Sequence, residues 1–229
     1  MKKNDLRAAR EAQRRRENRE TILRAAHAVI QRKGLSSASM DDVAAEAQFS
    51  KATLYKYFRS KSELVFEIVS QFLEDLDLQL RSELNRPARA SERLKGWISC
   101  SVRYLSENEN LARVLLLDRS VMRLLQIFVG RQEGAGTEAE KRFLQKILAK
   151  RKVMQQGSRT LLREGVSSGE FRPVDIEAGV KFIEAAIEGY IVGKFLDNSK
   201  ADLKRDIDSI EGFVFKGIQN SNVRKGDAS

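Results

Sequence analysis

Apolar residues recur along most of this chain at the three- and four-residue spacing of an α-helix, and from Lys61 to the end the sequence is typical of helix throughout. The pattern predicts a first helix from near Asn18 to Gly34, and long helices over 61–85, 91–106 and 137–164. Two short helices are expected between 111 and 125. The two prolines, Pro87 and Pro173, fall where the helical patterns break. The pattern therefore predicts an all-α protein.

Three helix starts follow one another closely between Ser39 and Ser60. Each begins with a serine whose side chain can accept from free backbone N–H groups, at Ser39, Ser50 and Ser60. They leave room for one short helix over about 40–47 and a second that begins at 51, with a tight turn between them. Phe49 and Leu54 are expected to close on the apolar face of the first of these helices. This is the outline of a helix-turn-helix.

The second short helix is polar on its outer side, and a recognition helix enters the major groove of DNA with its N-terminal residues nearest the bases. Phosphate contacts are expected from the lysines and tyrosines, and base contacts from the threonine. A purely structural role is the alternative for the aromatic residues; we accept it for Phe58 and leave it open for Tyr57. The candidate DNA-binding residues are Lys51, Ala52, Thr53, Tyr55, Lys56, Tyr57 and Lys61.

The positive charge is concentrated at the start of the chain. The formal net charge is +10; residues 1–63 hold 15 Lys and Arg against 8 Asp and Glu, a net of +7, which leaves +3 for the rest. Such a distribution favours binding to phosphate that weakens as salt rises. Residues 1–17 are expected to form a disordered basic arm, with Arg14, Arg15 and Arg16 as candidate DNA contacts. A solubilising tail is the alternative.

Other chemistry has little support in the sequence. His27 is the only histidine and Cys100 the only cysteine, so we expect no zinc site and no disulfide within the chain. Gly-rich phosphate loops and the usual hydrolase and protease motifs are absent, so an enzyme is not predicted. Apolar runs are shorter than the ~20 residues that cross a bilayer. A cytoplasmic protein is expected.

The stretch from Thr53 to Leu64, TLYKYFRSKSEL, closely resembles the T-L-Y-x-Y-F-x-S-K-x-x-L signature of the TetR/AcrR family of bacterial transcriptional regulators. The resemblance extends back to Ile22 and covers about the first quarter of the chain. Family members commonly have Gly-Val before the serine that opens the recognition helix, whereas this chain has Gln48-Phe49. Because glutamine lacks the freedom of glycine to adopt positive φ, we expect a slightly altered turn.

The resemblance implies a three-helix DNA-binding domain over 18–63 and a helical ligand-binding and dimerisation domain over 64–229. Two apolar seams near the end of the chain are candidates for a four-helix dimer interface, although both can instead face the core of their own domain. Residues of these seams step by three and four: Ile176, Val180, Ile183, Ile187, Tyr190, Leu203, Ile207, Ile210 and Val214. A two-fold dimer of this kind would read a palindromic operator.

A ligand cavity among the middle helices is also implied, with a small apolar or aromatic ligand and no cofactor. Its candidate lining residues are mostly apolar, which is equally typical of ordinary core. They are Trp97, Cys100, Tyr104, Leu117, Met122, Leu125, Phe128, Phe182 and Ile187. The resemblance further implies a repressor in which ligand binding moves the helix that starts at Lys61. A DNA organiser without a ligand response, and a helical carrier or enzyme, remain as rival hypotheses.

Overall fold

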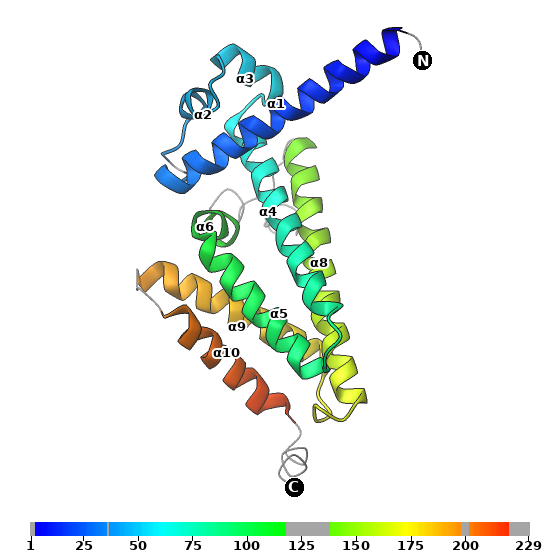
Figure 1. Cartoon of the computed structure of the whole chain (residues 1–229). Coiled ribbons are helices and arrows are strands. Elements are labelled where there is room, and N and C mark those ends of the chain that lie inside the picture. The colour runs from blue at the N-terminus through cyan, green and yellow to red at the C-terminus, as the bar shows by residue number, and fades with distance from the viewer. Residues whose placement is uncertain (1–2, 36, 118–137, 198–201, 220–229) are drawn as a thin grey trace. The chain divides into compact units, whose positions relative to one another are not determined.

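The computed structural model describes residues 3–35, 37–117, 138–197 and 202–219 (Figure 1). Within these ranges every regular element is an α-helix, and the one β-bridge, between Phe171 and Gln219, is isolated. The all-α prediction is confirmed. The chain forms two compact units, Met1–Gln71 and Phe72–Ser229, and the division between them lies within the helix that begins at Lys61.

Unit 1 contains α1 (Lys3–Lys33), α2 (Met40–Glu46), α3 (Lys51–Tyr57) and the first part of α4 (Lys61–Leu84). Its core is closed by side chains from all four helices, among them Ile22, Val29, Leu54 and Phe58, which are fully buried. Arg32 and Lys33 at the end of α1 form ion pairs with Glu46 and Asp42 of α2. These contacts fix α1 against the short helices.

The basic segment 1–17 differs from its prediction, because the structure continues α1 back to Lys3 instead of leaving a disordered arm. No glycine or proline interrupts residues 1–33. Gln13 bridges to Glu17 and accepts from Arg16 along the helix surface, which are the spacings at which helical side chains meet. All side chains from Leu6 to Glu17 are exposed, so this part of the helix has no tertiary packing.

Unit 2 contains the rest of α4 together with α5 (Ala90–Glu107), α6 (Glu109–Leu117), α8 (Glu138–Ser167), α9 (Ile176–Asp197) and α10 (Leu203–Ile218). Helix α5 lies between α8 and α9 and also packs against α10 (Figure 1). Leu94, Ile98 and Val102 of α5 are fully buried. Glu170 accepts from the backbone N–H groups of Ala90 and Ser91, so the start of α5 is capped from the loop after α8.

A buried ionic contact joins α4 to α8 within unit 2. Asp77 is 6% exposed and accepts from Arg81 on its own helix and from Lys150 on α8, each at 3.1 Å. Burial alone would raise the pKa of Asp77, but the hydrogen bonds from Arg81 and Lys150 outweigh it, and the pKa lies below its usual value. The ionised form of Asp77 is therefore the one that this contact stabilises.

Candidate functional site

The turn between α2 and α3 is a Schellman motif with glutamine in the position that favours glycine. Gln48 donates to the Ala45 carbonyl and Phe49 donates to the Ala44 carbonyl, which are the two bonds of that motif. Gln48 has a φ of +57° and is the one described non-glycine residue with positive φ. The turn therefore keeps its left-handed geometry, rather than the altered one expected, and the glutamine carries the strain.

The start of α3 is fixed by Ser50. Its Oγ accepts from the backbone N–H of Thr53 at 3.1 Å and lies 2.8 Å from the Thr53 hydroxyl. Leu54 points inward and is fully buried, so the neighbouring positions 52, 55 and 56 face solvent. This confirms the predicted orientation of the helix, with a short polar surface on one side and a single apolar anchor on the other.

Lys51 begins α3 and is held by an acidic residue of the helix before it. Its Nζ donates to Oδ2 of Asp41 at 3.0 Å and lies 2.8 Å from Oδ1, and this hydrogen bond raises the pKa of Lys51 above its usual value. Both side chains are more than half exposed. An anion that reaches Lys51 therefore competes with Asp41 at the surface, where an ion pair is weak. Asp41 was not among the residues predicted from the sequence.

The remaining candidate contacts divide into exposed and tethered side chains. Tyr55 is 41% exposed, and Ala52 and Lys56 are also exposed. The Tyr57 hydroxyl accepts from Asn18 of α1 at 3.0 Å and is half-buried, so it joins the recognition helix to α1 and still reaches the surface. Lys61 at the start of α4 is half-buried. Phe58 is fully buried, which confirms the structural role accepted for it.

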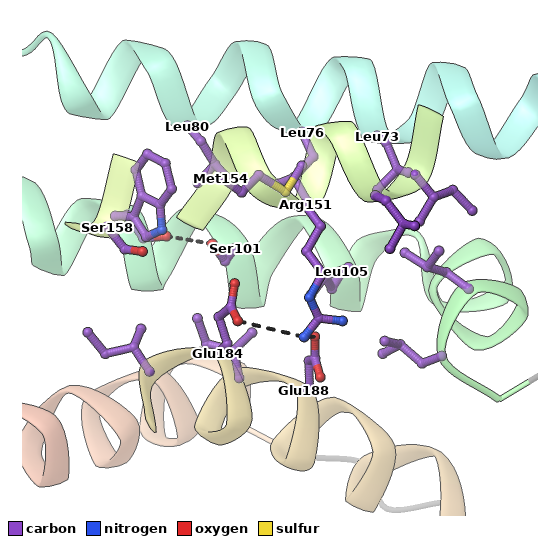
Figure 2. Close-up of a pocket in the computed structure, with 17 residues that line it drawn as sticks. Leu73, Leu76, Leu80, Ser101, Leu105, Arg151, Met154, Ser158, Glu184 and Glu188 are labelled. Atoms are coloured by element: carbon purple, nitrogen blue, oxygen red, sulfur yellow. Dashed lines mark hydrogen bonds and ion pairs between the residues drawn. The ribbon is translucent and has the colours of Figure 1, made fainter. Parts of the chain in front are cut away.

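A cavity of about 170 Å³ lies inside unit 2 (Figure 2). Its walls come from α4, α5, α6, α8 and α9, and most of the lining side chains are aliphatic. Leu73, Leu76 and Leu80 form the α4 wall. Gly157 of α8 allows the Trp97 ring to lie against the backbone, because a Cβ at this position would overlap the ring. The ring thereby becomes part of the cavity wall.

Three charged side chains interrupt this apolar lining. The Arg151 guanidinium of α8 lies 3.0 Å from Glu188 and 3.6 Å from Glu184, both on α9, as Figure 2 shows. Glu184 also accepts from Gln155 at 2.9 Å. Burial raises the pKa of Glu188, Arg151 opposes this, and Glu184 adds to it. One cation shared by two carboxylates gives this group a formal charge of −1.

The predicted lining residues are only partly correct. Trp97 and Ile187 line the cavity. Cys100 and Tyr104 do not, because they turn toward α4, where the Tyr104 hydroxyl donates to the Phe72 carbonyl and the Cys100 thiol to Gln79. Phe182 is also a wrong prediction, since it is 58% exposed on the outer side of α9. The Leu117 side chain, Met122, Leu125 and Phe128 lie outside the described residues.

The two predicted dimer seams mostly face the core of their own domain, which was the alternative interpretation. Val180, Ile183, Ile187, Ile207 and Val214 are buried within unit 2, so these five assignments are corrected. The other four, Ile176, Tyr190, Leu203 and Ile210, are half-buried. Tyr190 donates to Asp206 at 2.6 Å and thereby links α9 to α10.

The exposed apolar side chains of these two helices lie away from the buried seams. Phe182 and Leu196 of α9 and Phe213 of α10 are 58%, 73% and 76% exposed. At 3.6 residues per turn, Phe182, Ala185, Gly189, Gly193 and Leu196 lie within about 80° of one another, on the side of α9 opposite its buried residues. We call this set, together with Phe213, the outer apolar face.

Comparison with known proteins places this arrangement in a family. The sequence profile of the family described as "Bacterial regulatory proteins, tetR family" matches residues 22–68. The HTH-type transcriptional regulator YfiR of Bacillus subtilis is 30% identical over 185 residues, which are 80% of this chain and 82% of YfiR. The chain belongs to the TetR family. As a TetR-family member it is a DNA-binding transcriptional regulator, and this confirms the family prediction.

Two further comparisons extend the likeness over most of the chain. The repressor KstR2 of Mycobacterium tuberculosis is 25% identical over 163 residues, covering 71% of this chain and 74% of KstR2. FadR of Bacillus subtilis, solved in complex with stearoyl-CoA, has a TM-score of 0.67 at 23% identity and covers 87% of this chain and 99% of FadR. The second domain of this TetR-family protein therefore also has the family fold.

The described residues contain no helix that is both long and apolar enough to cross a membrane. Within the same ranges, no group of three or more His, Cys, Asp or Glu side chains is arranged to hold a metal ion.

Proposed function

We propose that this protein is a homodimeric repressor that binds a palindromic operator through α3 and releases it when an apolar effector enters the cavity of unit 2. The proposal rests above all on the combination of a helix-turn-helix with exposed polar residues and a separate helical unit that encloses an apolar cavity. The KstR2 name and the FadR complex support a repressor with an effector that has an apolar body.

In this proposal the exposed side of α3 reads the operator. Lys51 exchanges Asp41 for a phosphate or a guanine edge, and Thr53, next to the small Ala52, contacts a base. Tyr55 and Lys56 contact phosphates, and Tyr57 and Lys61 add contacts at the C-terminal end of the helix. Two copies of α3 in a two-fold dimer would lie one helical turn of DNA apart, about 34–36 Å, which gives the operator its palindrome.

The dimer of this proposal is formed through the outer apolar face. Large exposed apolar side chains that lie together mark interaction surfaces, and here they lie on two adjacent helices. A Cβ at Gly189 or Gly193 would meet no other atom in the single chain, so the glycines leave a flat surface on which a second copy of α9 can pack closely. Leu203 and Ile210, which are half-buried, border this surface on α10.

The cavity sets the class of effector. A cavity of about 170 Å³ is smaller than the ~300–1,000 Å³ typical of sites for drug-sized ligands, so it takes the apolar part of the effector. The formal charge of −1 on Arg151, Glu184 and Glu188 disfavours a free carboxylate beside them. A neutral polar group, such as the thioester and amide groups of an acyl-CoA, fits this environment better.

The first experiment is an anisotropy titration on the DNA upstream of the protein's own gene, against scrambled DNA at near-physiological salt. We expect preferential binding and a palindromic footprint. Lys51→Ala should lower the affinity by roughly 5- to 150-fold, as for a loss of about 1–3 kcal/mol. Lys33→Ala is the matched control, because Lys33 also pairs with an aspartate of α2 but lies on α1. Equal losses in both variants would contradict the assignment of α3.

The effector is tested by adding long-chain acyl-CoA to the operator complex, with CoA alone as the comparison. We expect acyl-CoA to release the DNA and CoA to leave it bound. Arg151→Ala should weaken this response because it removes the cation that the two cavity carboxylates share, whereas Lys152→Ala, at the exposed neighbouring position, should not. Release by CoA alone would contradict the role of the cavity.

A further inference from the structure

The first half of α1 carries a row of arginines on one side of the helix. Arg7, Arg10 and Arg14 step by three and four, and at 3.6 residues per turn they lie within about 60° of one another. All three side chains are exposed. The ion pairs within the described part of unit 1 involve none of them. We call these three residues the α1 stripe.

Two contacts further along α1 show which way the α1 stripe faces. Asn18 donates to Tyr57 of α3, and Arg19 forms an ion pair with Glu67 of α4 at 3.1 Å. Asn18 and Arg19 are about 100° apart around the helix, so α3 and α4 lie on different sides of α1. Viewed around the helix axis, the α1 stripe lies close to the direction of Asn18, on the side away from Arg19. It is therefore on the side of α1 that faces the recognition helix.

The α1 stripe also extends past the end of the domain core. At 1.5 Å per residue, Arg7 lies about 16 Å along the helix from Asn18. Figure 1 shows this blue end of α1 continuing beyond α3, with no other element of unit 1 beside it. Sixteen ångströms correspond to about five base pairs of B-DNA at 3.4 Å each. A duplex read by α3 would therefore pass the α1 stripe outside the half-site.

The charges near the α1 stripe also fit this position. Around the helix axis, Glu11 and Glu17 each lie about 60° from the centre of the α1 stripe, one on either side. Among the described ion pairs of unit 1, neither glutamate pairs with the stripe. A positive charge in the first turns of a helix is unfavourable beside the positive end of the helix dipole, and no tertiary packing supports the helix from Leu6 to Glu17. Phosphates beside the α1 stripe would remove this repulsion.

We propose that the α1 stripe binds phosphates of the DNA flanking the operator, so that each protomer contacts DNA at α3 and again along α1. The proposal rests on operator binding by α3. It differs from the sequence prediction for the arginine run, because it assigns the contact to Arg14 and two earlier arginines. Arg16 faces away from the α1 stripe, and Arg15 lies about 100° from it.

The test uses two operator duplexes and two charge-matched variants of the full chain. One duplex ends at the outer edge of the footprinted half-sites, and the other has about one helical turn, ~10 base pairs, added on each side. Arg10→Ala/Arg14→Ala removes two charges from the α1 stripe, and Arg15→Ala/Arg16→Ala removes two from elsewhere on the same helix. Circular dichroism checks that both variants keep the helicity of the wild type.

We expect the wild type to bind the extended duplex at least about tenfold more tightly than the trimmed one. Arg10→Ala/Arg14→Ala should lose this gain, and the slope of log K against log salt should fall by about 3.6 for four contacts per dimer. Arg15→Ala/Arg16→Ala should keep most of the affinity gain on the extended duplex and most of the wild-type salt slope.

Equal losses in the two variants would overturn the proposal in favour of diffuse attraction, and no loss in either would overturn it outright. A different result would assign the α1 stripe to a membrane surface instead. In that case Arg10→Ala/Arg14→Ala would lose binding to phosphatidylserine vesicles but would still bind the extended duplex more tightly than the trimmed one. If the wild type bound no DNA site preferentially, operator binding itself would be overturned. That result is distinct, because it does not depend on either variant.

Discussion

The strained turn between α2 and α3 provides a direct test of the structure through Gln48→Gly. An L-residue in the left-handed region costs about 1–2 kcal/mol relative to the right-handed region. Glycine has no such cost, but it loses about 0.5–1 kcal/mol more in conformational entropy on folding. Because Gln48 has a φ of +57° and is exposed, no side-chain packing is lost. The substitution should therefore increase the free energy of unfolding by about 0.5–1 kcal/mol.

Urea denaturation followed by circular dichroism measures this change, and two further variants establish its cause. Ala45→Gly introduces glycine three positions earlier, at an exposed site within α2. This substitution should lower the free energy of unfolding by about 0.5–1 kcal/mol. Gln48→Val should also be destabilising, because a β-branched residue tolerates positive φ poorly. If Gln48→Gly were no more stable than the wild type, and Gln48→Val no less, the left-handed turn would be refuted.

Three further predictions concern unit 2. Gly157→Ala should push the Trp97 ring into the cavity and cost about 1–3 kcal/mol of stability. It should also shift the fluorescence of Trp97, the single tryptophan of the chain, and an unchanged emission spectrum would contradict the close contact. Asp77→Asn should cost about 1–2 kcal/mol at pH 7 and progressively less as the pH falls from 3.8, the usual pKa of this carboxyl, through its lowered pKa in the folded protein. Urea midpoints at pH 7 and along an acidic series check this. Phe182→Arg/Phe213→Arg should give monomers by light scattering, whereas Leu78→Arg, equally exposed on α4, should leave dimers.

The helix-turn-helix was predictable because its signals are local. The capping serines and the apolar face place α2 over about 40–47 in the sequence, and the structure has it at Met40–Glu46. Ser39 accepts from Asp42 and Asp42 accepts from Ser39, as a capping box requires. Hydrogen bonds from Lys33 and Ser39 lower the pKa of Asp42 to about 2, so this cap is kept until the solution is strongly acidic. Except for the hydrogen bond from Lys33, each of these contacts joins residues that are at most four positions apart in the sequence.

The strain at Gln48 was only partly predictable. The resemblance indicated that glycine is usual there, but whether the turn or the residue would adapt depends on the position of α3 against α2. Phe49 is half-buried and donates to Ala44, and Leu54 is fully buried one turn into α3. These contacts would move if the turn opened, so packing favours the strained residue over a different turn.

The cavity was the least predictable part, because one apolar pattern serves both core and ligand site. Leu73, Leu76 and Leu80 look like any buried helix face, and Cys100 and Tyr104 share the spacing of Trp97. A usable signal was present on α8, where the stripe Ile147, Met154 and Ser158 is interrupted by Arg151. A charge in an apolar stripe indicates a partner across a cavity, but the partners on α9 appear only in the fold.

Helix α9 explains why the dimer seam was assigned to the wrong side of the helix. In the proposed repressor it also connects the effector cavity to the dimer interface. It is apolar on two opposite sides: Ile183 and Ile187 line the cavity, and Phe182 and Leu196 belong to the outer apolar face. A search for one apolar stripe finds the buried side first because its spacing is more regular. In the proposed function, however, the two sides have different partners, the effector on one and the second protomer on the other.

This arrangement predicts a coupling that can be measured without DNA. If the effector shifts α9 through Ile183 and Ile187, the outer apolar face moves with the same helical turns, so effector affinity and dimer affinity must be linked reciprocally. We expect acyl-CoA to change the dimer dissociation constant in sedimentation experiments. Glu188→Gln, which removes one carboxylate from the cavity, should alter the size of that change while leaving the dimer without ligand intact. A dimer affinity independent of acyl-CoA would show that the effector acts through another helix.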